Sequence, residues 1–82
     1  MTAKEMFEAL GWELVDSPED YRDEIIYYTK TQGSAVYDLD FYLDDKTYYS
    51  YGIVKGHEIG YPLNTQEHLA ITQQMKELGW IE

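Results

Sequence analysis

Cysteine is absent from the 82 residues of this chain. The absence excludes a disulfide-stapled scaffold and any zinc site built from thiolates, and it is compatible with a reducing cytoplasm. Long apolar runs are also missing. None approaches the roughly 20 residues that a membrane-spanning helix needs, and the opening MTAKEMFEAL lacks the apolar core of a signal peptide. We therefore expect a cytoplasmic protein.

Basic residues are few. The chain has 6 Lys and Arg against 16 Asp and Glu, which leaves a net charge of −10. The bases stand singly, at Lys4, Arg22, Lys30, Lys46, Lys55 and Lys76. Electrostatic binding of nucleic acid needs clustered basic side chains that displace counterions from the phosphates. We therefore expect no direct nucleic-acid binding and no adsorption to an anionic membrane.

Apolar and aromatic residues, by contrast, are plentiful. They make up 44% of the sequence, which is too much for an intrinsically disordered chain despite its charge. A chain of 82 residues corresponds to one small domain, which buries about 60–65% of its unfolded surface. We expect a single domain over residues 1–82.

The segment from residue 35 to 53 predicts a β-hairpin with two different faces. Alternate side chains of a strand point to opposite sides of a sheet. The odd positions from 35 to 43 are apolar or aromatic, whereas the even positions include Asp38, Asp40 and Tyr42. We expect the apolar face to pack against the rest of the protein and the acidic face to meet solvent.

The register of this hairpin depends on the length of its loop. A three-residue loop over residues 44–46 pairs Phe41 with Tyr49, and it leaves Tyr48 and Ser50 on the outer face with the two aspartates. A shift by one residue would instead pair Phe41 with Tyr48 and bury less apolar surface. Because such a slip exchanges the faces of a strand, burial should select the register, and we predict the first one.

Two helices are predicted by matching signals at their ends. Thr2 with Glu5 has the spacing of a capping box, in which side chains satisfy the first free N–H groups of a helix. Asn64 with Glu67 repeats this spacing. A Leu-Gly-Trp triplet follows each segment, at residues 10–12 and 78–80. Glycine there favours a Schellman motif, so we expect a short first helix and a longer second one.

The remaining segments supply further strands. Residues 25–29 are Ile-Ile-Tyr-Tyr-Thr, all with a strong β preference. We therefore predict a strand over residues 24–31, after a turn over residues 17–23. Shorter strands are candidates at residues 12–15 and 57–61.

Together these elements predict an α+β fold. An antiparallel meander of three to four strands carries a short N-terminal helix and a longer C-terminal helix on one face, because a small sheet needs a covered face to be stable. The covered face should be the one with Leu39, Phe41, Tyr49 and Tyr51. The second helix should turn an apolar stripe toward it, made by His68, Ile71, Met75 and Leu78.

The histidines and carboxylates form no recognisable catalytic or metal-binding motif. His57 with Glu58, and Glu67 with His68, lack the spacing of a metal site, and His68 is expected to pack on the apolar face of its helix. The hairpin aspartates lie on an open sheet face, whereas acid–base catalysis needs a pocket that raises the pKa of one carboxyl group. We expect no metal, no cofactor and no enzymatic activity.

Three stretches of the sequence together resemble a known group of proteins. They are AKEMFEALGWE at residues 3–13, YDLDFYLDDKTYYSYG at residues 37–52 and ITQQMKELGW at residues 71–80. The combination is similar to small uncharacterised proteins of phages and prophages in Gram-positive bacteria, and the resemblance extends over most of the chain. The resemblance implies a phage-encoded accessory protein that acts in the host cytoplasm. It brings no catalytic residue with it.

An acidic surface remains as the candidate site. It comprises the outer face of the hairpin and the acidic loop before residue 24, with Asp38, Asp40, Tyr42, Tyr48, Ser50, Asp20 and Asp23. Acids flanked by tyrosine can bind a basic protein, because complementary potential orients docking and tyrosine adds contact area at low entropic cost. The hypothesis is a small protein-binding module. A DNA-mimic inhibitor of a basic host protein is one specific form of it.

Two other interpretations stay open. Acids at solvent-facing strand positions also keep a small sheet soluble and block edge pairing, which requires no partner. Alternatively, the apolar remainder of the sheet or an exposed edge strand joins copies of the chain into a structural homo-oligomer. A salt-sensitive protein partner would favour the binding module over both.

Overall fold

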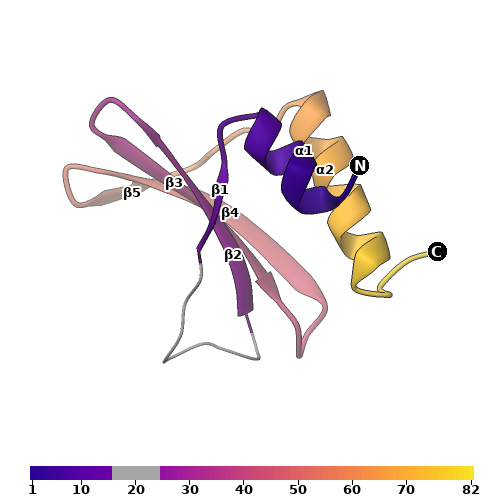
Figure 1. The fold of residues 1–82 in the computed structure, drawn as a ribbon. Coiled ribbons are helices and arrows are strands. Elements are labelled where there is room, and N and C mark those ends of the chain that lie inside the picture. Colours follow the sequence, from indigo (N-terminus) through magenta and orange to yellow (C-terminus); the bar gives the residue numbers. More distant parts are fainter. Residues whose placement is uncertain (16–24) are drawn as a thin grey trace.

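In the computed structural model, which describes residues 1–15 and 25–82, a five-stranded sheet carries two helices on one of its faces (Figure 1). The elements in chain order are α1 (Ala3–Ala9), β1 (Glu13–Val15), β2 (Ile25–Gln32), β3 (Ala35–Tyr42), β4 (Thr47–Val54), β5 (His57–Ile59) and α2 (Thr65–Glu77). Each strand pairs antiparallel with its neighbour in the chain, so the sheet is a meander. The predicted α+β fold is confirmed, and both short candidate strands join the sheet. The predicted turn over residues 17–23 lies outside the described residues.

The ends of α1 follow the signals in its sequence. The Glu5 N–H donates to the Thr2 hydroxyl at 3.1 Å and the Thr2 N–H donates to the Glu5 side chain at 2.8 Å, which completes the capping box. At the other end Gly11 takes a φ of 93°, and the Trp12 N–H donates to the Phe7 carbonyl at 3.0 Å. This Schellman motif turns the chain back on the helix, so the indole of Trp12 packs edge-on against the Phe7 ring.

The ends of α2 repeat both arrangements. Asn64 and Glu67 form its capping box. Gly79 takes a φ of 79°, and the Trp80 N–H donates to the Met75 carbonyl at 2.9 Å. The two Leu-Gly-Trp triplets are therefore two helix ends with the same backbone geometry.

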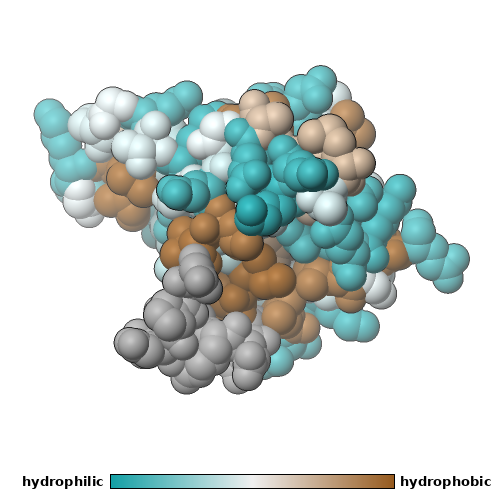
Figure 2. All heavy atoms as spheres, in the orientation of Figure 1, coloured by the Kyte–Doolittle hydropathy of each residue, from teal (hydrophilic) through white to brown (hydrophobic). Residues whose placement is uncertain are grey.

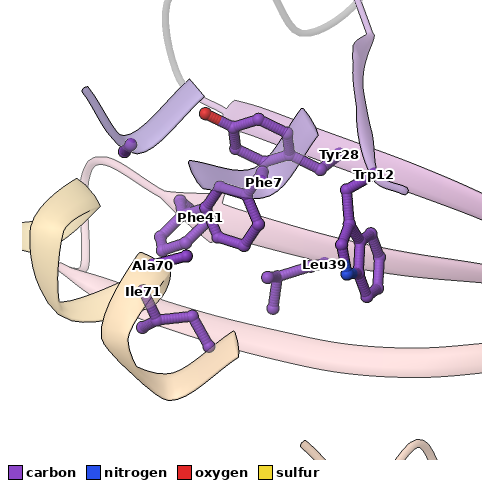
Figure 3. Packing of buried hydrophobic residues seen from close by; sticks show 8 residues of the cluster. Phe7, Trp12, Tyr28, Leu39, Phe41, Ala70 and Ile71 are labelled. Carbon is purple, nitrogen blue, oxygen red and sulfur yellow. The ribbon is translucent and has the colours of Figure 1, made fainter. Parts of the chain in front are cut away.

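The core lies between the helices and the central strands. Phe7 stands in its middle, with its ring centroid 4.2 Å from that of Tyr28 and 6.3 Å from that of Phe41 (Figure 3). The fully buried apolar cluster consists of Ala3, Phe7, Trp12, Tyr28, Leu39, Phe41, Ala70 and Ile71. In Figure 2, brown apolar side chains gather in the middle of the view, where the helices meet the sheet. Removing this surface from water, at about 25 cal/mol per Å², holds both helices on the same face.

The register of β3 and β4 corrects the prediction. Phe41 pairs with Tyr48 and not with Tyr49, because four residues, 43–46, separate the strands where a loop of three was predicted. Lys46 ends this loop with a φ of 57°, and its N–H donates to the last carbonyl of β3 at 2.9 Å. The difference of one residue exchanges the two faces of β4.

A close contact of Tyr37 explains the observed register. Tyr37 pairs with Gly52, and a Cβ at residue 52 would lie 2.6 Å from Cδ1 of Tyr37 and 3.1 Å from Cγ1 of Ile59. The Tyr37 ring therefore lies over the glycine, and it packs on Tyr61 with a centroid distance of 4.6 Å. In the predicted register Tyr37 would pair with Ile53, whose side chain leaves no room for the ring.

The buried face of α2 also differs from the predicted stripe. His68 is exposed, so its predicted packing on the sheet is wrong. The helix instead buries Glu67, Ala70, Ile71 and Gln74. A buried polar group is costly unless it is hydrogen-bonded. Here the Tyr28 hydroxyl donates to Gln74 Oε1 at 2.7 Å, and Glu67 has several partners.

Glu67 is fully buried and accepts hydrogen bonds from three directions. Its Oε2 atom receives the Trp12 Nε1–H at 2.9 Å and the Tyr61 hydroxyl at 2.6 Å, and its Oε1 atom receives the Asn64 N–H at 3.0 Å. The Lys30 ammonium lies 3.8 Å from Oε2. Burial by itself would raise the pKa of Glu67, but these hydrogen bonds and the lysine charge outweigh it and lower the pKa below 4.5.

Glu67→Gln should lower the free energy of unfolding at pH 7 by about 2–4 kcal/mol, because the amide cannot accept all three hydrogen bonds. Glu5→Gln is the matched control. Glu5 holds the same place in the capping box of α1 but is exposed, so its substitution should cost less than about 1 kcal/mol. Urea unfolding measures both, and equal losses would contradict the role assigned to Glu67.

The contribution of Glu67 should also depend on pH. Its pKa is lower in the folded protein than its ordinary value of 4.5. Its stabilisation is therefore complete above about pH 4.5 and is lost as the pH falls through the folded-state pKa. The difference in unfolding free energy between the wild type and Glu67→Gln should shrink over that acidic range.

Gly52→Ala should destabilise the protein by about 1–3 kcal/mol, because the added methyl group meets the ring of Tyr37. Gly60→Ala is the control, since nothing lies within 4 Å of a Cβ at that position, and it should change stability by no more than about 0.5 kcal/mol. Thermal unfolding compares the two. A tolerated Gly52→Ala would contradict the register explanation.

Candidate functional site

The outer face of the sheet is the candidate site. Both helices lie on the opposite face (Figure 1), so neither covers it. The register places two carboxylates in its middle. Asp40 pairs with Tyr27 of β2 on one side and with Tyr49 of β4 on the other. Asp38 pairs with Tyr51 of β4.

A pocket of about 320 Å³ opens on this face. Three neighbouring strands form it, and its lining residues are Ile25, Tyr27, Asp38, Asp40, Tyr42 and Tyr51. We refer to it as the outer-face pocket. Its lining combines three tyrosine rings, one aliphatic side chain and two carboxylates, and none of these residues is basic.

Tyrosine hydroxyls hold the two carboxylates in place. The Tyr51 hydroxyl donates to Asp38 Oδ2 at 3.1 Å, and the Tyr42 hydroxyl donates to Asp40 Oδ2 at 3.3 Å. Tyr49 lies outside the pocket but stacks on Tyr51, with ring centroids 5.4 Å apart and an angle of 27° between the planes. The rings and the acids are therefore positioned by contacts within the face.

Asp40 is in an unfavourable place for a charge. Its Oδ1 atom is shielded from water and receives no hydrogen bond within the described part of the chain. Burial, and then the charge of Asp38, raise the pKa of Asp40 to about 6, against a hydrogen bond from Tyr42 that lowers it. Burial and the charge of Asp40 also raise the pKa of Tyr51 above 10.0, so its hydroxyl remains a donor at neutral pH.

The structure brings together only some of the predicted site residues. Asp38, Asp40 and Tyr42 line the outer-face pocket. Asp20 and Asp23 lie outside the described residues. The predicted acidic site therefore reduces, in the described residues, to three consecutive outward positions of β3.

Tyr48 and Ser50 are not part of the outer face, and their predicted placement there is wrong. In the observed register they lie on the same side of the sheet as Phe41 and the helices. The Tyr48 ring packs beside Phe41 with a centroid distance of 5.8 Å. The Ser50 hydroxyl donates to the Tyr61 carbonyl at 3.4 Å.

Three residues of the pocket were missed by sequence reasoning. Ile25 and Tyr27 occupy alternate positions of the predicted strand 24–31, so the two-residue period of a strand indicates that they share one face of the sheet. Pairing that strand with the hairpin would have placed both beside Tyr42 and Asp40. Tyr51 carried no such signal, because its face depends on the register of β4.

One expectation from the sequence is wrong here: the hairpin aspartates do not lie on an open face, because Asp38 and Asp40 line a pocket and burial raises the pKa of Asp40. The same carboxylates accept hydrogen bonds and the aromatic faces attract cations, so the face can bind a cationic group. Within residues 1–15 and 25–82, no three His, Asp or Glu side chains are grouped as metal ligands would be, and His57 and His68 are both exposed. In the same residues, neither helix combines the length and the apolar character needed to span a bilayer.

Comparisons of the chain with protein-family models, with curated proteins and with solved structures gave no match. The function is therefore inferred from the geometry and charge of the outer face itself.

Asp40→Asn should stabilise the protein at pH 8 by about 1–2 kcal/mol and leave its stability almost unchanged at pH 4. The pKa is about 6 in the folded protein against an ordinary 3.8, so folding favours the protonated acid. Below about pH 4, where Asp40 is protonated in both states, it does not lower the free energy of unfolding. As the pH rises through about 6, ionisation of Asp40 lowers this free energy.

Urea unfolding at several pH values measures this effect. The titratable groups around Asp40, which share its environment, are those of Asp38, Tyr42, Tyr27 and Tyr51. The control is Glu82→Gln, which removes one negative charge at an exposed position and should show no such pH dependence. An equal gain for Asp40→Asn at both ends of the pH range would contradict the buried charge.

Proposed function

We propose that this protein is a non-enzymatic, phage-encoded accessory protein that binds a basic protein through the outer face of its sheet, in the cytoplasm of the host. One observation carries the proposal. The two aspartates of β3 lie in a pocket that neither helix covers and that tyrosine rings wall, on a chain whose net charge is −10. An acidic surface only for solubility requires no pocket and no ring wall.

Electrostatics supports a basic partner. An excess of negative charge attracts a positive surface over about 10 Å in moderate salt, and complementary potential raises the rate of docking and fixes its orientation. Tyrosines then supply contact area with few rotatable bonds. The outer face offers four tyrosines for this purpose, at positions 27, 42, 49 and 51.

A specific form of the proposal is an inhibitor that occupies the nucleic-acid groove of a basic host protein. Such a groove is lined by Lys and Arg that receive phosphates, and carboxylates on a rigid sheet present the same sign of charge. The protein itself would not bind nucleic acid, because its few bases are scattered.

Self-association through the outer face is disfavoured by the same charges. Two copies packed face to face would bring their Asp38 and Asp40 side chains together, and like charges across such an interface are destabilising. Sedimentation of the purified protein at micromolar concentration checks this point. A stable homodimer that persists in Asp38→Asn/Asp40→Asn would favour a structural homo-oligomer instead.

Affinity capture from a Gram-positive host lysate at low and high salt tests the proposed function. The wild type should retain a basic protein at low salt and release it at high salt. Asp38→Asn/Asp40→Asn should retain it about tenfold less well. Glu8→Gln/Glu82→Gln removes the same charge at exposed positions away from the pocket and should retain it nearly as the wild type does.

Failure to capture any salt-sensitive protein would count against the function. So would an equal loss of capture in the two double variants, because the effect would then come from net charge alone and not from the outer face.

A further inference from the structure

The chemistry of the outer-face pocket points to a particular side chain of the partner. Resting on the proposed function, we infer that this pocket receives the guanidinium group of one arginine from the basic partner, held by Asp38 and Asp40 between the surrounding tyrosine rings. The inference identifies what the pocket binds, whereas the proposed function concerns the whole face.

The size of the pocket suits one side chain. Its volume of about 320 Å³ is at the lower end of the roughly 300–1,000 Å³ that small-ligand pockets span. Three neighbouring strands form it, so a partner that docks on the outer face of the sheet can reach it with a side chain.

The polar groups of the pocket leave acceptors unused. The Tyr51 and Tyr42 hydroxyls each donate to an Oδ2 atom, whereas Oδ1 of Asp40 receives no hydrogen bond within the described residues. Each carboxylate oxygen can accept more than one hydrogen bond, so the two Oδ2 atoms that Tyr51 and Tyr42 bond keep further acceptor capacity. A ligand that supplies several donors and a positive charge would complete this site.

Arginine fits this requirement better than the other cations. Its guanidinium is planar, carries five N–H donors and binds carboxylates in a fork geometry. It also stacks on aromatic faces and is more weakly hydrated than the ammonium of lysine, which matters among three tyrosine rings. The methylene stem has an apolar contact in Ile25. In the described part of the chain, no three His, Asp or Glu side chains are grouped as metal ligands would be.

An arginine within a protein is favoured over free arginine. The free amino acid brings one guanidinium group and nothing that contacts the face around the pocket, because the charges of its α-ammonium and α-carboxylate groups cancel. A peptide-linked arginine instead arrives from a surface that the rest of the outer face attracts.

The experiment is an NMR titration of the full chain with Nα-acetyl-arginine amide. Two analogues are measured beside it: Nα-acetyl-lysine amide keeps the charge but not the planar fork, and Nα-acetyl-citrulline amide keeps the shape but not the charge. The arginine compound should bind about tenfold or more tightly than citrulline and about threefold or more tightly than lysine. The perturbed amide signals should belong to β2, β3 and β4 around the pocket.

Variants separate the roles of charge and ring. Asp40→Asn should weaken binding of the arginine compound about tenfold, whereas Glu8→Gln should change it less than about twofold. Tyr51→Leu removes both a ring wall and the hydroxyl that holds Asp38, and it should weaken binding about fivefold, whereas Tyr51→Phe loses only the hydroxyl and should weaken binding less than Tyr51→Leu does. A dispersed spectrum shows that each variant is folded, and Tyr51→Phe is the most conservative of them.

Equal binding of citrulline, equal or tighter binding of lysine, or perturbed signals on another surface would each overturn the inference. The two proposals also fail separately. If a basic protein is captured through Asp38 and Asp40 but the arginine compound does not bind, this inference falls and the proposed function stands. If the compound binds but no salt-sensitive protein is captured, the proposed function falls and the pocket is a guanidinium site without a protein partner.

Discussion

A single buried carboxylate joins the parts of this small protein. Glu67 lies in the first turn of α2 and belongs to its capping box. It also accepts a hydrogen bond from the indole N–H of Trp12, which follows α1, and one from the hydroxyl of Tyr61, which precedes α2. Lys30 of β2 lies close enough to balance its charge. Because a charge without partners cannot remain in a protein interior, these four contacts must form together. They thereby fix how α2 sits on α1 and on the sheet.

Both helices lie on one face of the sheet. Alternate residues of β3 therefore point into the core and toward the candidate site. Leu39 and Phe41 point into the cluster around Phe7, and Asp38 and Asp40, which alternate with them along the strand, point the opposite way. The packing on the other side of the same strand thus supports the outer face. For the proposed binding, a face supported in this way would need little reorganisation when a partner docks, which limits the entropic cost of association.

Local signals predicted much of the fold. The capping boxes and the Leu-Gly-Trp ends depend on residues within about five positions of one another, and their backbone geometry follows in the structure. The strand at residues 24–31 was predicted by a run of residues with strong β preference, and the alternation of β3 predicted which of its residues face the helices. For the candidate site, the same alternation identified Asp38, Asp40 and Tyr42. Whether these residues bind a partner stays a prediction.

The amino-acid sequence by itself determined the net charge, the two helices with their ends, the order α–β–α and the inward face of β3, because each depends on composition or on short-range spacing. Only the tertiary structure decided the register of β4, the buried face of α2 and the membership of the pocket. Each of these was settled by contacts between residues far apart in the chain. The Tyr37 ring needs Gly52 beneath it, and buried Glu67 and Gln74 need the donors Trp12, Tyr61 and Tyr28. From the sequence alone, a polar residue on a helix is expected to face solvent. Its burial can be predicted only when the donor from another part of the chain is known.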